Sequence, residues 1–195
     1  MKLLKGLLAV SLLSLAAHAN AGAIYATDID WQNNGTIGGA NDRDNPANAL
    51  GSPDGQFTAI GLGGFAVFEF GETFTGPSSI WEVTFGCGND CGHYPEKAQV
   101  WVGNNYNFGS HDFSDLSDFT HLGDITNTEA NGGGSVLFDG TWTYLALVDI
   151  SATISSKSTD GFDVDAISVQ KVPEPQTFVL LGLGLIALRA ARKAK

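Results

Sequence analysis

Acidic side chains are concentrated in the segment 160–167, which otherwise has the apolar pattern of a strand. Asp163 and Asp165 share one side of that strand with Ile167, because strand side chains alternate between faces. A carboxylate on a buried side must accept backbone N–H bonds or bind a cation, since an unpaired charge there is costly. Calcium prefers oxygen ligands and is the candidate cofactor, with solvated or turn-capping carboxylates as the alternative. The predicted calcium set is Asp54, Asp160, Asp163 and Asp165.

Cys87 and Cys91 are the only cysteines and lie close together in the chain. In an oxidising compartment the expected state is a disulfide, which in so small a loop shapes a turn more than it stabilises the fold. The alternative is a zinc site that adds His93 to the two thiolates, but a fourth ligand is absent. We therefore predict the disulfide.

Aromatic residues near segment ends are the predicted ligand-binding groups. Trp31, Trp101, Tyr106 and Trp142 lie near such ends or among Asn and Gly, where a ring can stack on a sugar. Core or rim packing is the alternative for most of them. The histidines are scattered and no serine has a nucleophile-elbow context, so we predict no catalytic residue and no enzyme.

The segments that carry these residues have β-strand character. No stretch between 22 and 172 has a helical period, while β-branched and aromatic segments recur between Gly, Asn and Asp clusters. The predicted fold is all-β: an antiparallel β-sandwich of about eight strands, flanked by a signal peptide and a C-terminal hydrophobic helix. The predicted strands lie near 24–29, 57–60, 65–70, 80–85, 98–102, 119–124, 135–138, 144–148 and 163–169.

Two of these strands have a two-sided pattern. Ala66, Phe68 and Phe70 oppose a face that carries Glu69, and Glu82 shares a face with Ile80 in the later strand. The pattern predicts that one face of each strand is buried and that the other is wet.

The first 21 residues have the features of a secretory signal peptide. Lys2 and Lys5 precede an apolar stretch, and Ala19 and Ala21 form a small-residue cleavage pattern. We predict cleavage after Ala21, export through the Sec translocon, and an ectodomain that spans 22–172.

The C-terminal segment 173–195 has three parts in order. Pro173, Glu174 and Pro175 precede an apolar segment, 177–188, and a basic terminus. As a helix, residues 177–191 span only about 22 Å, which is short of the roughly 30 Å hydrocarbon core. The basic residues favour the cytoplasmic side, which places the domain outside.

This layout resembles the PEP-CTERM sorting signal of exported proteins in Gram-negative bacteria that make exopolysaccharide. The resemblance implies an exosortase as partner, transient anchoring in the inner membrane through the C-terminal helix, and a final location at the cell surface or outside the cell. An ordinary single-span anchor is the alternative.

The ectodomain is strongly acidic. Residues 22–172 carry four basic and twenty acidic side chains, a net charge of −16. This charge argues against nucleic acid and anionic lipid as partners and is compatible with neutral sugars, divalent cations or basic proteins.

Four motifs of the ectodomain, at 48–55, 61–70, 96–103 and 160–167, resemble a recurrent domain of bacterial cell-surface proteins. That domain is similar in plan to the discoidin or galactose-binding-like jelly roll. The resemblance implies an adhesive role in exopolysaccharide or biofilm and no catalytic residue, and the cysteine segment has no counterpart in it.

Three functions remain open. The first is a non-catalytic surface or matrix protein that binds exopolysaccharide or another envelope component. The second is a structural matrix protein, bridged by cations or self-associating, without a discrete ligand site. The third is a hydrolase, for which the sequence offers no recognisable machinery.

Overall fold

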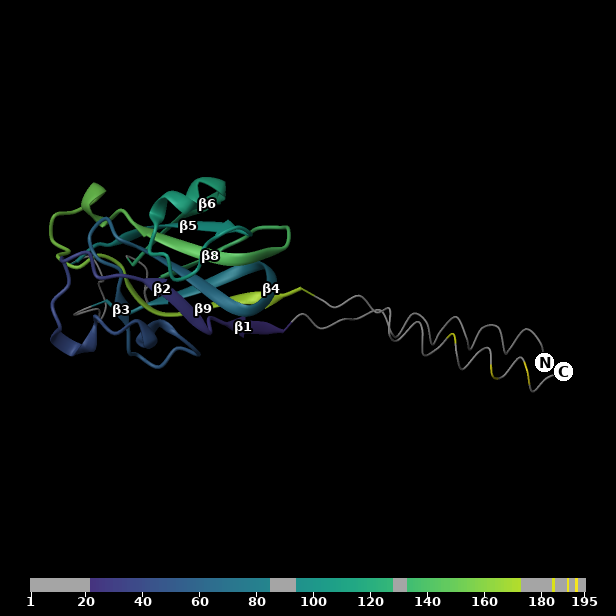
Figure 1. Cartoon of the computed structure of the whole chain (residues 1–195). Coiled ribbons are helices and arrows are strands. Elements are labelled where there is room, and N and C mark those ends of the chain that lie inside the picture. Colours follow the sequence, from purple (N-terminus) through teal and green to yellow (C-terminus); the bar gives the residue numbers. More distant parts are fainter. Residues whose placement is uncertain are drawn as a thin grey trace. The chain divides into compact units, whose positions relative to one another are not determined.

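The computed structural model describes residues 22–84, 94–127 and 133–172, together with Gly184, Arg189 and Arg192. The strands within these ranges all belong to one compact unit, Gly22–Lys171 (Figure 1). Among the described residues, no helix has the length and apolar character needed to cross a membrane. Of the predicted apolar helix 177–188, only Gly184 is described.

Nine strands and several short 3-10 turns make up the described part of this unit, and the strands pair antiparallel throughout. This confirms the predicted all-β class. The strands are β1 (Ala23–Tyr25), β2 (Asp28–Trp31), β3 (Thr58–Ala59), β4 (Phe65–Glu82), β5 (Lys97–Gly103), β6 (Thr120–Thr126), β7 (Gly134–Val136), β8 (Trp142–Asp149) and β9 (Asp163–Lys171). The turns are η1 (Ala40–Asp42), η2 (Pro46–Ala49), η4 (Phe113–Asp118) and η5 (Ser151–Thr153).

Strand β4 belongs to both layers of a sandwich. Its first half pairs with β2 and β8, and after a register shift between Glu69 and Phe74 its second half pairs with β9 and β7. One layer is therefore β2-β4-β8-β5-β6, and the other is β1-β9-β4-β7 with β3 added on β9. The sequence predicted separate strands near 65–70 and 80–85. The structure joins them into one strand, within which the chain changes partner strands.

The main core combines side chains from both layers. Leu145 of β8 and Ile167 of β9 are fully buried in it. Ala66, Phe68 and Phe70 of β4 are buried in the same core, which confirms the inward face predicted for this strand.

The opposite face of the first half of β4 is covered. Val67 of β4 and Ala146 of β8 are fully buried in a second cluster. The connection between β5 and β6 supplies Tyr106, Leu116 and Phe119 to this cluster. The prediction of a wet face is therefore wrong here, because a connection that looked polar carries apolar side chains onto the sheet.

Candidate functional site

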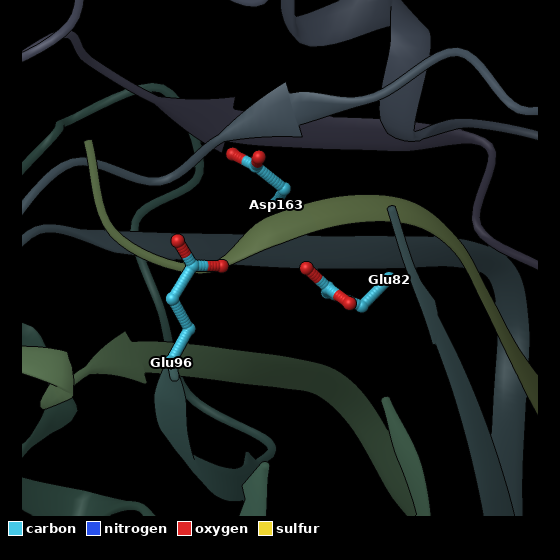
Figure 2. A group of neighbouring side chains, drawn as sticks. All are labelled: Glu82, Glu96 and Asp163. Carbon is cyan, nitrogen blue, oxygen red and sulfur yellow. The ribbon is translucent and has the colours of Figure 1, made fainter. Parts of the chain in front are cut away.

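Three carboxyl groups from different strand ends meet inside the domain. Glu82 ends β4, Glu96 immediately precedes β5, and Asp163 begins β9. The pairing of β4 with β9 brings the first and third together, and the Val83 N–H donates to the Asp163 carbonyl at 3.1 Å. One carboxylate oxygen from each side chain lies within 4.8 Å of the others, and Figure 2 shows the three side chains grouped together. We call Glu82, Glu96 and Asp163 the acidic cluster.

Asn127 ties two members of the acidic cluster together. Its side-chain amide donates to Glu82 Oε1 at 3.4 Å and to Glu96 Oε2 at 3.3 Å, and its oxygen accepts from the Glu96 N–H at 2.8 Å. The Thr84 hydroxyl donates a further bond to Glu82. Asp163 differs, because its Oδ1 is buried and has no hydrogen-bond partner. One carboxyl group of the cluster is thus left unsatisfied.

Burial raises the pKa of every member. Loss of hydration is the largest cause in each case, and it raises the pKa of Glu82 to about 7 and that of Glu96 to about 8. The pKa of Asp163 rises to about 9, through burial first and then through the charges of Glu96 and Glu82. The cluster therefore keeps protons near neutral pH unless another positive charge replaces them.

A pocket of about 510 Å³ lies beside the acidic cluster. Glu96 and Asp163 line it, together with Arg43, which forms an ion pair with Asp160. The Arg43 guanidinium carbon lies 5.6 Å from the centre of the Phe57 ring. Charged and aromatic groups thus converge on one concave site, as in sites for small polar ligands. The lining also includes Asn41, Tyr94 and Thr159.

The four acids of the predicted calcium set are spread over different arrangements. Asp163 belongs to the acidic cluster, and Asp160 pairs with Arg43. Asp165 accepts the backbone N–H groups of Asp54 at 3.0 Å and of the following glycine at 3.2 Å. The Asp54 side chain is exposed and accepts a hydrogen bond from the backbone two residues later. Asp165 is therefore stabilised by backbone N–H donors. The sequence predicted either such donors or a bound cation for a buried acid on this strand.

The four predicted sugar platforms lie outside the pocket lining. Trp31 is buried, and its indole N–H donates to a backbone carbonyl at 3.0 Å. Tyr106 is buried, and its hydroxyl donates to a carboxylate at 2.7 Å. Trp142 donates to a backbone carbonyl at 2.8 Å, and the Trp101 ring lies 4.7 Å from that of His121, centre to centre. Both of these indoles are partly exposed.

Several residues of the pocket and cluster were not predicted as site residues. The sequence pattern placed Glu82 on the wet face of its strand with Ile80, and this assignment is wrong, because the structure buries both side chains. Arg43, Phe57 and Tyr94 carried no usable signal, because they come from connections whose course a sequence pattern does not reveal.

The sorting-motif residues Pro173, Glu174 and Pro175 lie outside the described residues, but sequence comparison covers them. Residues 171–193 match the family model of the PEP-CTERM protein-sorting motif, which confirms the resemblance of the tail. The motif indicates export and sorting to the cell surface. The predicted disulfide between Cys87 and Cys91 also lies outside the described residues and stays a prediction.

Solved structures with a similar fold contain carbohydrate-binding modules. One is a truncated AlyQ with CBM32 and alginate lyase domains, with a TM-score of 0.51 and 13% identity. The match covers 81% of this chain, which spans only 36% of that one. Another is the CBM32 of AlyQ in complex with 4,5-unsaturated mannuronic acid, with a TM-score of 0.50, 12% identity, and coverage of 76% and 97%. These similarities confirm the predicted jelly-roll sandwich. No curated protein matches the chain in sequence.

Proposed function

We propose that this protein is an exosortase-sorted surface or matrix protein whose β-sandwich binds a carbohydrate without catalysis. The sorting motif at 171–193 supports the route to the surface. The observation that carries the binding role is the pocket in which Arg43, Asp160 and Tyr94 converge. The fold adds support, because a similar module was solved with 4,5-unsaturated mannuronic acid bound.

The pocket has the groups that recognise a sugar ring. Tyr94 is 41% exposed and offers an apolar ring face for stacking on the C–H side of a sugar. The paired Arg43 and Asp160 offer donors and acceptors to neighbouring hydroxyl groups. Asn41 and Thr159 add neutral polar groups to the same lining.

The charge of the pocket favours a neutral sugar over a uronic acid. Arg43 faces three acids of the same lining, namely Glu96, Asp160 and Asp163. The ectodomain also carries a net charge of −16. An anionic glycan would therefore be repelled at a distance and would find the Arg43 charge already paired with Asp160.

A hydrolase needs one protonated and one ionised carboxyl group across the scissile bond. Glu82, Glu96 and Asp163 are only 5%, 4% and 7% exposed, which favours a structural or ion-binding role over direct attack on a polysaccharide chain. A purely structural matrix protein, bridged by cations, is the second non-catalytic alternative.

Glycan binding tests the proposal directly. We expect purified protein to bind neutral glycans on an array, and Tyr94→Ala and Arg43→Gln to weaken binding at least about tenfold in calorimetry. Leu137→Ala is the control, because Leu137 is 82% exposed and is not among the residues that line the pocket. If only Trp101→Ala or Trp142→Ala weakened glycan binding, the ligand would bind at the aromatic residues predicted from the sequence and not in the pocket.

Two further outcomes would contradict the proposal. Release of reducing ends from the bound glycan would make the protein a hydrolase, and absence of any glycan binding would favour the structural alternative. The sorting route has its own test, since exosortase processing predicts that the intact mass of the surface-released protein lacks residues 178–195. A mass that includes the basic terminus would favour a permanent anchor.

A further inference from the structure

The acidic cluster is the feature of the described domain that glycan binding explains least. Glu82, Glu96 and Asp163 are only 5%, 4% and 7% exposed, and they come from three separate segments. Carboxyl groups gathered in this way repel one another when ionised and lose hydration, so the folded protein must either keep them protonated or supply a compensating cation. We propose that these three side chains are ligands of a calcium ion.

The spacing of the oxygens suits calcium. Two ligand oxygens of one ion cannot lie farther apart than twice the metal–oxygen distance, which is about 4.8 Å for calcium and about 4.2 Å for magnesium. One carboxylate oxygen of each residue lies within 4.8 Å of the other two. This spacing is compatible with coordination of one calcium ion by all three groups.

Asp163 provides a second, independent observation. Its Oδ1 is buried and accepts no hydrogen bond, although the residue is only 7% exposed. Two other buried acids of the domain, Asp149 and Asp165, are held by backbone donors. Asp149 accepts from the N–H groups of Gly63 and Phe162, both at 3.0 Å, and Asp165 accepts two such bonds from its loop. An unpaired carboxylate oxygen inside a group of buried acids is placed to coordinate a cation.

The donor set selects a hard cation. The three ligands are carboxylate oxygens, and no histidine or cysteine among the described residues belongs to the cluster, whereas zinc prefers those two ligand types. The side-chain nitrogen of Asn127 donates hydrogen bonds to Glu82 and Glu96. Asn127 therefore positions two of the ligands and is not a ligand through this nitrogen. Glu96 and Asp163 also line the pocket, which gives the ion a route of entry and leaves space for water ligands.

This site differs from the calcium set that the sequence predicted. Only Asp163 is common to both. The carboxylate of Asp165 is already held by two backbone N–H groups, and Asp160 is paired with Arg43. The inference is also independent of the proposed glycan binding, because it rests on the carboxyl groups alone.

Calcium titration of the purified full-length protein, after treatment with chelator, tests the site. Glu96→Gln and Asp163→Asn each remove one charged ligand, and Asp139→Asn makes the same charge change at an exposed position. We expect the parent and Asp139→Asn to bind calcium with equal affinity. The two cluster variants should bind at least about tenfold more weakly, because ligand charge sets calcium affinity. They should also lose the calcium-induced rise in melting temperature.

The variants separate loss of a ligand from loss of folding. Gln and Asn have nearly the shape of protonated Glu and Asp, so both cluster variants should melt in chelator at or above the parent temperature. Equal calcium affinity in the parent and both variants would overturn the site. A loss of calcium affinity in Asp165→Asn alone would place the ion beside Asp165 and not in the acidic cluster. An equal rise in melting temperature with magnesium, at equal ionic strength, would mean that the effect is general screening of charge.

Discussion

Asp163 and Asp165 stand two residues apart on β9 and are almost equally buried, at 7% and 6% exposure, yet their surroundings differ. Asp165 accepts two backbone N–H groups from the loop at 54–55. Asp163 Oδ1 accepts no hydrogen bond, and the side chain lies beside two further carboxyl groups. The role of a buried acid thus depends on which distant segments meet it, and not on its place in the strand pattern.

The largest effect is expected at Asp165. Asp165→Ala leaves two backbone N–H groups without their charged acceptor, so we expect the free energy of unfolding to fall by about 3 kcal/mol. Urea denaturation at neutral pH measures this loss, which should be the same in calcium and in chelator. Asp139→Ala, at an exposed position, is the control. A loss below about 1 kcal/mol would mean that the loop bonds contribute little.

The next effect is a pH dependence that belongs to the acidic cluster. In chelator, Glu96 and Asp163 keep their protons in the folded protein up to pKa values of about 8 and about 9. In the unfolded chain they release them near their ordinary pKa values, about 4.5 and about 3.8, so the folded state binds more protons in between. The resulting stability is complete below pH 4 and is lost as the pH rises towards 9.

Thermal melts in chelator from about pH 5 to about pH 9 test this direction. We expect the melting temperature to fall by several degrees across the series in the parent and by less in Glu96→Gln, which has no proton to lose there. A melting temperature that rises with pH in the parent would contradict the raised pKa values.

A smaller effect is expected when Asp163 is neutralised. Asp163→Asn in chelator at neutral pH should change the free energy of unfolding by less than about 1 kcal/mol, because the amide replaces a carboxyl group that is already protonated. Asp165→Asn under the same conditions should be clearly more destabilising. Urea denaturation measures both variants. Equal losses of unfolding free energy in Asp163→Asn and Asp165→Asn would contradict the contrast between the two residues.

The smallest effect is expected at Asp54. Its exposed side chain accepts hydrogen bonds from Gln56, which hold the pKa of Asp54 below its ordinary value. Asp54→Ala removes those bonds but keeps the backbone N–H that Asp165 accepts, so we expect the melting temperature to change by less than about 2 °C. A fall close to that of Asp165→Ala would show that the Asp54 side chain shapes the loop.

Strand patterns predicted much of this fold. The alternation of Ala66, Phe68 and Phe70 identified an inward face, and the turn-rich composition pointed to a sandwich. Alternation could not show that β4 continues into the second layer, because the change of partner takes place at an irregularity between Glu69 and Phe74 that leaves no periodic signal. It also could not show that the β5–β6 connection covers Val67, since packing of a long connection leaves no periodic signal.

The site was less predictable than the fold for the same reason. Asp163 was singled out, but its neighbours Glu82 and Glu96 are far from it in sequence. Glu82 meets it through the pairing of β4 with β9, which includes a register shift between Trp81 and Glu82. A shift of this kind has no signature in a single sequence. Glu96 precedes β5, which pairs with β6 and β8, and its carboxylate also lies beside that of Asp163. The loops that bring Arg43 and Phe57 to the pocket also have no sequence pattern that predicts their course.

The position of strand β9 determines the direction in which a pulling force would act on the domain. Its first residue, Asp163, borders the pocket, and its last, Lys171, is where the match to the sorting motif begins. The strand's nine residues place these ends about 26 Å apart, at about 3.3 Å per residue. If the proposed ligand is bound in the pocket and the chain is held at Lys171, a pull between the two runs along β9. The hydrogen bonds of β9 to β1, β3 and β4 are then sheared together instead of being opened one after another.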